Sequence, residues 1–270
     1  MSGVAADGGR PLSAALLRTA LGSPDGFWRQ VDVVAQTGST NADLLAAARC
    51  GAVEGTVLAA ETQTAGRGRA GRSWVSLPGT ALTFSVLLRP GSVPPAVRGW
   101  LPLLAGVAVA EALNQVAGVD ARLKWPNDVL VAGGKVAGIL AEQDADAIVV
   151  GIGINVRTAE QDLPVATATS LRLHGAGDTD RSELLAAVLE SLQRWYLSWR
   201  QTGSGDAQSC GLRPSYLRLS ATVGQQVQVS MPGGHLLAGT AQDVDGTGRL
   251  VVRSEAGLVA VSAGDVIHVR

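Results

Sequence analysis

Two lysines stand out because arginine carries almost all of the positive charge in this sequence. The chain has 270 residues and 22 basic side chains, and all of these except Lys124 and Lys135 are arginine. A background that favours arginine should replace lysine wherever charge alone is needed. An ammonium group differs from a guanidinium in size, hydration and donor geometry. We therefore interpret both lysines as kept for lysine chemistry.

The segment 66–72, with the sequence GRGRAGR, is a candidate anion-binding loop. Its three glycines let backbone amides approach an anion closely. Its three arginines supply forked donors that suit phosphate or carboxylate. No acidic residue occurs between Glu61 and Glu111, so the local field is positive. The alternatives are a flexible basic surface loop and a nucleic-acid contact.

Lys124 lies in the segment 122–129, RLKWPNDV. This pattern predicts a strand that ends at Pro126, with Asn127 and Asp128 at the tip of the connection, where functional side chains tend to project. Asp128 could hold Mg²⁺ or accept a proton. An ordinary Asn–Asp turn would explain these two residues equally well, but it would not explain the lysine.

Lys135 follows Gly133-Gly134, a pair that predicts a two-residue hairpin turn. Three residues further on, Gly138 leaves room for a ligand to lie against the predicted strand. The alternative is an edge strand with an exposed lysine.

The segment 150–155, VGIGIN, places two glycines on one face of a predicted strand. Gly151 and Gly153 would clear space for a flat group, and Asn155 would offer amide donors beyond it. Close packing of a helix on that face is the alternative.

Apolar periodicity and turn residues predict an α+β fold, in which helices flank a mixed β-sheet. The predicted helices cover residues 12–21, a segment capped by Ser39, 96–118 and 182–200, and the predicted strands cover 31–36, 56–61, 81–88, 122–125, 129–131, 136–142 and 147–154. After residues 202–205 the pattern changes to short strands at 226–230, 238–243, 249–254, 258–261 and 266–269, with turns at 232–234, 245–246 and 263–265. Such closely spaced strands predict a small barrel.

Composition excludes several classes of function. The net charge of -1 gives no general attraction to nucleic acid. The two cysteines have no zinc-ligand spacing. The N-terminus lacks a basic start followed by a long apolar run, and the apolar stretch 100–113 is interrupted by Pro102, Gly106 and Glu111. We therefore expect a cytoplasmic protein without a membrane span.

Taken together, the order and spacing of these segments resemble the bacterial biotin–protein ligase family. The matching residues are Ser39-Thr40-Asn41, Gln63, GRGRAGRSW at 66–74, KWPND at 124–128, GKVAGIL at 134–140 and GIGIN at 151–155. The resemblance covers about residues 31–200 and is weaker beyond them. It implies a class II synthetase-like catalytic domain over 26–218, an N-terminal extension over 1–25 and an SH3-like domain over 219–270. The short N-terminal segment suggests the enzyme-only form, without a DNA-binding repressor domain.

The resemblance also implies a reaction and a set of site residues. Biotin would be activated by ATP and Mg²⁺ to biotinyl-5′-AMP, with release of pyrophosphate, and then transferred to a carrier lysine. The implied catalytic residues are Lys135, Arg69, Arg72 and Asp128, with Asp128 also the candidate metal ligand. Biotin would contact Ser39, Thr40, Asn41, Gln63, Gly66, Arg67, Arg69, Lys135, Gly138 and Gly151. ATP and the adenylate would contact Arg69, Arg72, Trp74, Lys124, Asn127, Gly153 and Asn155.

The expected acceptor is the biotin carboxyl carrier domain of an acyl-CoA carboxylase, and the expected assembly is a monomer or a weak homodimer. A lipoate–protein ligase is the alternative within the same fold, although lipoate has no ureido ring for Ser39, Thr40 and Gln63 to bind. A DNA-binding regulator and a non-enzymatic nucleic-acid module are less consistent with the charge and with a C-terminal region poor in aromatic residues.

Overall fold

The larger part of the molecule is built on a seven-stranded mixed sheet with the order β1-β2-β3-β7-β6-β5-β4. The computed structural model describes residues 9–21, 26–231 and 235–269, so the predicted turn at 232–234 and the first residues of the N-terminal extension lie outside it. Only β1 and β2 pair in parallel. The strands are β1 (Gln30–Thr37), β2 (Thr56–Gln63), β3 (Ala81–Leu88), β4 (Ala121–Lys124), β5 (Asp128–Val131), β6 (Gly134–Asp144) and β7 (Ala147–Asn155). The predicted α+β class is confirmed.

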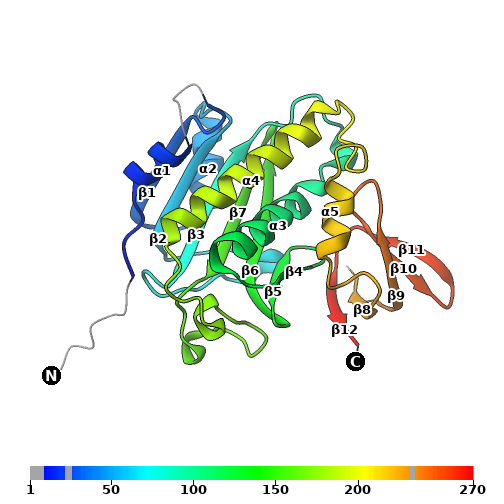
Figure 1. Ribbon diagram of the computed structural model, residues 1–270. Coiled ribbons are helices and arrows are strands. Elements are labelled where there is room, and N and C mark those ends of the chain that lie inside the picture. The colour runs from blue at the N-terminus through cyan, green and yellow to red at the C-terminus, as the bar shows by residue number, and fades with distance from the viewer. Residues whose placement is uncertain (1–8, 22–25, 232–234, 270) are drawn as a thin grey trace.

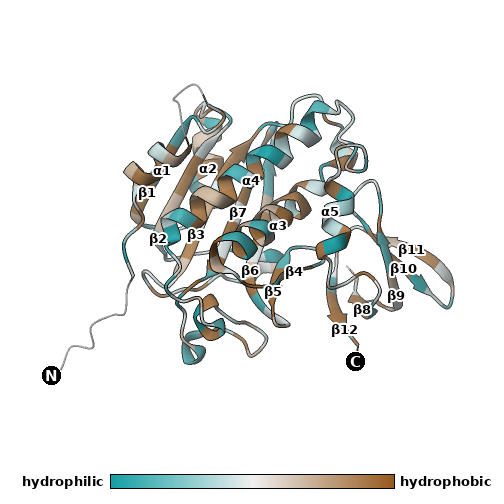
Figure 2. Ribbon diagram, in the orientation of Figure 1, coloured by the Kyte–Doolittle hydropathy of each residue, from teal (hydrophilic) through white to brown (hydrophobic). Residues whose placement is uncertain are grey.

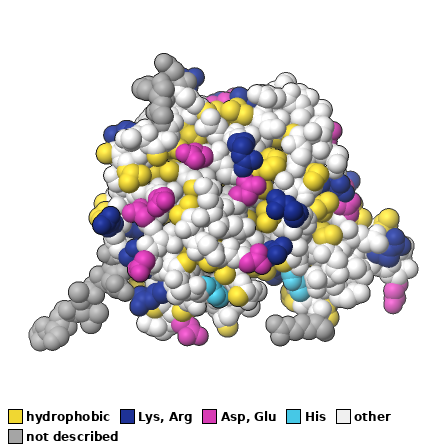
Figure 3. Space-filling view, viewed as in Figure 1, with side chains coloured by type: hydrophobic (Ala, Val, Ile, Leu, Met, Phe, Trp, Pro, Cys, Tyr) yellow, Lys and Arg dark blue, Asp and Glu magenta, His cyan; other side chains and the backbone are white. Residues whose placement is uncertain are grey.

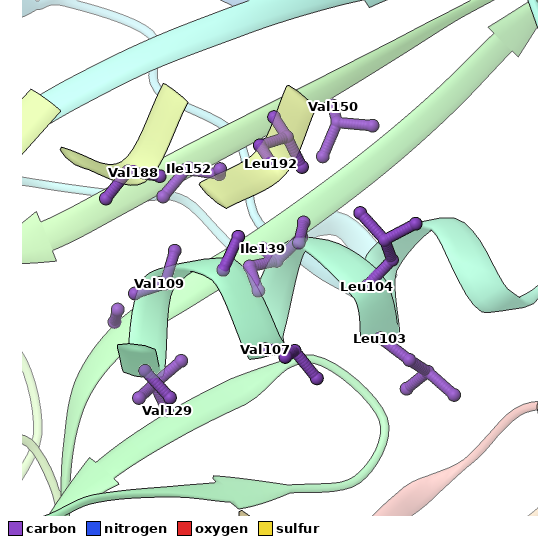
Figure 4. Packing of buried hydrophobic residues seen from close by; sticks show 14 of the residues in the cluster. Leu103, Leu104, Val107, Val109, Val129, Ile139, Val150, Ile152, Val188 and Leu192 are labelled. Atoms are coloured by element: carbon purple, nitrogen blue, oxygen red, sulfur yellow. The ribbon is translucent and has the colours of Figure 1, made fainter. Parts of the chain in front are cut away.

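Helices cover both faces of this sheet. Helices α3 (Trp100–Ala112) and α4 (Arg181–Gln201) cross one face, and α2 (Thr40–Arg49) covers the other (Figure 1). Figure 4 shows Leu104 and Val107 of α3 in one cluster of buried residues with Ile139 and Ile152 of the sheet. These side chains are almost fully buried, and their removal from water supplies the main driving force for this part of the fold.

Helix α3 is apolar over most of its length, as Figure 2 shows, and Glu111 near its C-terminal end is its one charged residue; the helix lies between the sheet and α4. It begins at Trp100 rather than at residue 96, since a short 3₁₀ turn at Pro95–Val97 precedes it. A π-helical turn at Leu113–Ala117 extends it to Gly118. The segment Trp100–Ala117 is long and apolar enough to cross a membrane, but 67% of it is buried inside the protein. It is therefore a core helix.

Helix α2 starts where the sequence predicts. The Ser39 hydroxyl accepts from the backbone N–H of Ala42 at 3.5 Å, and Asp43 lies in the first turn. Gly51, with a φ of 90°, allows the chain to leave the helix. This start matters for function because it fixes Thr40 and Asn41 at the end of the helix that faces the middle of the sheet.

The C-terminal part forms a second, antiparallel sheet with the order β11-β10-β9-β8-β12. Its strands are β8 (Gln226–Ser230), β9 (Leu236–Val244), β10 (Leu250–Ser254), β11 (Gly257–Val261) and β12 (Asp265–His268). The indole N–H groups of Trp100 and Trp125 donate to the carbonyl oxygens of Gly246 and Gly248, which joins this sheet to the larger part.

Two local features differ from the sequence predictions or were absent from them. The β5–β6 hairpin turns at Ala132-Gly133, whose φ angles are 48° and 83°, so the turn lies one residue earlier than predicted and β6 begins at Gly134. Helix α5 (Leu212–Leu219) was not predicted, and it contains Pro214 close to its start. Helix α1 (Ala14–Leu21), in the predicted N-terminal extension, packs on α4 and β1.

Candidate active site

A cavity of about 660 Å³ lies over the middle of the sheet, on the face that α2 covers. Two rows of residues lie in register across β3, β7 and β6 beneath it, and their β6 and β7 members line the cavity. One row is Ser85, Gly151 and Leu140, and the next is Thr83, Gly153 and Gly138. The rows are two residues apart along the strands, or about 7 Å. The cavity is of a size that holds a small-molecule ligand.

The row that contains Gly151 carries a connected set of polar groups. Thr40 donates its backbone N–H to the Gln63 Oε1 atom at 2.9 Å, and its hydroxyl lies 2.6 Å from the Ser85 hydroxyl. Ser85 in turn donates to Asn41 Oδ1 at 2.6 Å. The Asn41 amide nitrogen donates to Glu142 Oε2 at 2.8 Å and to the Leu140 carbonyl at 3.2 Å.

Gly151 has a different role from the one expected. A Cβ atom at this position would lie 2.2 Å from Asn41 Oδ1, so the missing side chain makes room for Asn41 rather than directly for a ligand. Because Ser85 and Leu140 flank Gly151 in register, Asn41 reaches both of them across it. All of the Asn41 amide is thus engaged by the protein, and its side chain supports the cavity wall.

The second row holds an aromatic ring. A Cβ atom on Gly153 would lie 2.4 Å from the Trp74 indole, and one on Gly138 would lie 3.2 Å from it. The two glycines therefore clear a flat space, as expected, and Trp74 occupies it. The Trp74 Nε1 atom is buried and has no hydrogen-bond partner among the residues that the structure describes. A ligand group that offers an acceptor here would satisfy it.

Lys135 lies at the same row and is held by a carboxylate. Its Nζ atom is 2.6 Å from Asp128 Oδ1, and the two side chains are about one-third and one-fifth exposed. Its Cε and Nζ atoms also lie close to Gly138. The ammonium group is thus fixed over the cavity floor, with two further N–H groups to offer to an anion.

The glycine–arginine loop folds back on itself as a small hairpin that borders the cavity. Trp74 donates its backbone N–H to Gly66 at 2.9 Å, and Arg67 forms an isolated bridge with Ser73. Ala70 and Gly71, with φ angles of 52° and 74°, make the turn. Gly66 faces the Trp74 carbonyl rather than the cavity, so it shapes the hairpin. Contrary to expectation, it is not among the residues that line the cavity.

Arg69 and Arg72 connect this hairpin to other parts of the site. Arg69 donates to the Asn127 Oδ1 atom at 3.0 Å. Burial lowers the pKa of Arg69 from its ordinary value, while the nearby carboxylates of Asp265 and Asp128 oppose that change. Arg72 reaches the C-terminal sheet, where its Nη2 atom is 2.8 Å from Asp265 Oδ1. Both guanidinium groups line the cavity.

Asn155 closes the far end of the site. Its amide nitrogen donates to the Thr169 carbonyl at 3.0 Å. The backbone of Lys135 pairs with Thr167 and Thr169, which brings the segment 164–168 to the cavity wall. Asn155 therefore holds a wall segment by its side chain, and the contact with ATP or the adenylate expected of it would have to use its side-chain oxygen.

The structure brings together nearly all of the predicted site residues. Those that line the cavity are Ser39, Thr40, Asn41, Gln63, Arg67, Arg69, Arg72, Trp74, Lys124, Asn127, Asp128, Lys135, Gly138, Gly151, Gly153 and Asn155. Sequence reasoning missed Ser85, Glu142 and Asp265. For Ser85 a signal was present, because it is one of two hydroxyl residues in the otherwise apolar strand 81–88.

Comparison with known proteins matches both parts of the chain. The Biotin/lipoate A/B protein ligase family matches residues 36–158, and the Biotin protein ligase C terminal domain matches residues 222–269. A biotin–[acetyl-CoA-carboxylase] ligase of Mycobacterium tuberculosis is 44% identical over 96% of this chain and 97% of that protein. A bifunctional ligase/repressor of Bacillus spizizenii is 32% identical over 87% of this chain and 72% of that protein.

A solved structure has the same fold. The biotin protein ligase of Aquifex aeolicus, in complex with biotin and ATP, is 30% identical to this chain, with a TM-score of 0.74. The match covers 90% of this chain and 99% of that one. With so little of either chain left unmatched, the likeness extends into both parts of the molecule.

Proposed function

This chain belongs to the biotin protein ligase family, and from that premise we propose how the residues of its cavity divide the work of the reaction. The enzyme activates biotin with ATP. The biotin carboxylate attacks the α-phosphate, biotinyl-5′-AMP forms and pyrophosphate leaves. The amine of a lysine on the carrier domain then attacks the carbonyl of the mixed anhydride, an amide bond forms and AMP leaves. The site roles below are our proposal.

We place the biotin ring at the row of Ser85 and Gly151 and the biotin carboxylate at the row of Gly153 and Gly138. The ring end offers Ser39, Thr40 and Gln63, whose hydroxyl and amide groups suit the donors and the acceptor of a ureido ring. The observation that carries this orientation is Lys135, which is fixed by Asp128 at the opposite end of the cavity floor. Its ammonium group would supply the counter-charge for a carboxylate at that row.

The first chemical step joins two anions, so fixed positive charge should contribute most of the catalysis. Lys135 would hold the biotin carboxylate and the oxygens of the developing acyl phosphate. Arg69 and Arg72 would stabilise the negative charge that builds on the α-phosphate. Lys124, which also lines the cavity, would bind the leaving pyrophosphate. Asn127 would act through Arg69, because it fixes the position of that guanidinium.

Trp74 and the hairpin would protect the product of this step. Water hydrolyses a mixed anhydride, and closing a site excludes water. The indole lies against Gly153 and Gly138, where a flat group of the adenylate would also lie. We propose that the indole shifts to cover the adenylate once it has formed, while the glycine–arginine loop closes over both.

For Mg²⁺, the described residues contain no group of three or more His, Cys, Asp or Glu side chains that could hold a metal ion. Within the described part of the chain, Asp128 is the only carboxylate that lines the cavity, and it is paired with Lys135. A single carboxylate fits a Mg²⁺ ion that arrives with ATP and is bound mainly by the ATP phosphates. Asp128 could complete such a site by releasing Lys135, or it could receive the proton of the incoming carrier lysine.

For partners, we propose that the acceptor is the biotin carboxyl carrier domain of an acyl-CoA carboxylase and that the reaction takes place in the cytoplasm. Figure 3 shows the face of the molecule that α3 and α4 cover. Basic and acidic side chains are interspersed on it, which does not favour nucleic-acid binding there. A monomer or a weak homodimer is our working hypothesis for the assembly.

One experiment tests the proposal directly. The protein is mixed with labelled biotin, Mg·ATP and a biotin-carrier domain, and label is sought on the carrier lysine. We expect label to transfer with biotin, and not with lipoate or with a carrier whose target lysine is replaced by arginine. Transfer of lipoate at a comparable rate would contradict the assignment of the ring end.

A further inference from the structure

Two residues outside the expected site, Ser85 and Glu142, form a series of hydrogen bonds with Asn41 and Thr40. This hydrogen-bonded chain of side chains ends at the part of the cavity where we place the biotin ring. Ser85 is fully buried, and Thr40 and Asn41 are each at most 4% exposed. Each hydrogen position in this chain follows from the identity of the atoms around it.

Glu142 fixes the orientation of the Asn41 amide. The amide nitrogen faces two acceptors, a Glu142 carboxylate oxygen at 2.8 Å and the Leu140 carbonyl at 3.2 Å. Turning the amide over would place its oxygen against both of them. A carboxylate and a carbonyl can only accept, so that orientation is unfavourable. The other Glu142 oxygen forms an ion pair with Arg67 Nη1 at 3.3 Å.

The fixed amide then determines the direction of the next two bonds. Asn41 Oδ1 has no hydrogen, so the Ser85 hydroxyl must donate its only hydrogen across the 2.6 Å contact. The Ser85 oxygen can then only accept. The second 2.6 Å contact, between Ser85 and Thr40, therefore uses the Thr40 hydrogen. The Thr40 hydroxyl also lies 3.1 Å from Gln63 Oε1, but its hydrogen is already used toward Ser85. Gln63 Oε1 accepts from the Thr40 backbone N–H.

We propose that Glu142 and Ser85 act as positioning residues that make the Thr40 hydroxyl an acceptor toward the cavity, so that this end of the site selects a ring N–H donor. The ureido ring of biotin has two such N–H groups, and the dithiolane ring of lipoate has none. The inference rests on the proposed placement of biotin. It goes further by assigning the choice of ring to residues that lie behind the cavity wall.

The Glu142→Gln substitution tests this direction of bonding. A glutamine can donate as well as accept, so a turned Asn41 amide would be opposed only by the Leu140 carbonyl, and the hydrogens of Ser85 and Thr40 could reverse more readily. The ligands for the test are biotin and two cyclic carbamate analogues, each with one ureido N–H replaced by a ring oxygen. The quantity measured is, for each analogue, the ratio of its Kd to the Kd of biotin. KM and kcat for pyrophosphate release are measured alongside.

In the wild-type protein we expect one of the two analogues to bind more weakly than biotin by on the order of 10²-fold, because the Thr40 oxygen and a ring oxygen would face each other without a hydrogen. In Glu142→Gln we expect this ratio to fall at least about tenfold, with kcat at saturating biotin changed little. Ser85→Ala, which interrupts the same chain, should also reduce the ratio.

Asp144→Asn is the matched control. Asp144 lies two residues from Glu142 on the same face of β6, pairs with Arg49 and lies outside the cavity. Its ratio should equal that of the wild-type protein. Thermal melting checks that each variant is folded. The inference is overturned if the ratio of analogue Kd to biotin Kd stays unchanged in both Glu142→Gln and Ser85→Ala while biotin and the analogue bind more weakly by the same factor. That result would show a purely structural role. Failure of the wild-type protein to release pyrophosphate with biotin would instead contradict the proposed function.

Discussion

Arg72 of the glycine–arginine loop donates to Asp265 of strand β12 across 2.8 Å, which ties the edge of the cavity to the C-terminal sheet. The two side chains are 61% and 52% exposed, so the pair contributes little to stability. Its importance lies in competition. The guanidinium that we expect to bind ATP phosphate is already occupied by a carboxylate.

Replacing this carboxylate should therefore favour the nucleotide. We expect Asp265→Asn to lower KM for ATP by about two- to fivefold, the range that corresponds to an exposed ion pair, and to leave the melting temperature nearly unchanged. Steady-state pyrophosphate release measures the effect. Asp144→Asn, which removes an exposed carboxylate from a distant ion pair, is the control. A higher KM in Asp265→Asn would mean that Asp265 organises Arg72 for binding.

Removing the Lys135 ammonium should abolish most of the first step. We expect Lys135→Ala to lower the rate of adenylate formation by at least about 10²–10³-fold, the cost of losing one fixed donor to developing charge. Because the Lys135 side chain is partly exposed, we expect no large loss of stability in this variant. Quench-flow measurement of biotinyl-5′-AMP tests this, and near-normal pyrophosphate release would exclude the role.

The role of Asp128 can be separated from that of its partner. In Asp128→Asn, preformed biotinyl-5′-AMP is supplied, so that only transfer to the carrier lysine is followed. A slower transfer whose deficit is reduced at higher pH is expected if Asp128 receives the lysine proton. If only the Mg²⁺ dependence of adenylate formation changes, and transfer does not, the proton-acceptor role is excluded.

The glycine–arginine loop should become more ordered when ligands bind. Its backbone bonds lie largely within the hairpin, and Arg69 and Arg72 anchor it through Asn127 and Asp265. Few anchors predict frequent opening. We expect hydrogen exchange in residues 66–72 to slow after addition of biotin and ATP. Identical exchange with and without ligands would contradict a closing role.

His268 predicts how stability depends on pH. Burial lowers the pKa of His268, and the charge of Lys124 lowers it further. The unfolded chain then binds more protons than the folded protein at and below the ordinary histidine pKa of about 6.5, so stability should fall as pH decreases through that range. We expect His268→Gln to reduce the loss of melting temperature between about pH 7.5 and about pH 5.5. An equal loss in both proteins would mean that other groups cause it.

Much of the site could be predicted from sequence because its residues occur in short, ordered motifs. Lys124, Asn127 and Asp128 are neighbours in the chain, and their strand and turn follow from local pattern. The partners that were missed lie far away in sequence: Ser85 bonds a residue 44 positions away, and Asp265 one 193 positions away. Local pattern carries no information about such pairs, because only the packed fold brings them together.

The role of a glycine was also harder to predict than its presence. The alternation of Gly151 and Gly153 correctly indicated a cleared strand face. It could not indicate that a protein side chain, Asn41, fills the space over Gly151. That outcome depends on how α2 is set against the sheet, which follows from the whole core and not from the segment 150–155.

The position of Trp74 makes the protein its own optical reporter. The chain has six tryptophans, and the other five, Trp28, Trp100, Trp125, Trp195 and Trp199, are buried away from the cavity. A ligand that enters beside Gly153 must alter the surroundings of the Trp74 indole alone. Intrinsic fluorescence should therefore follow the arrival of biotin, the formation of the adenylate and its departure in real time, without a label.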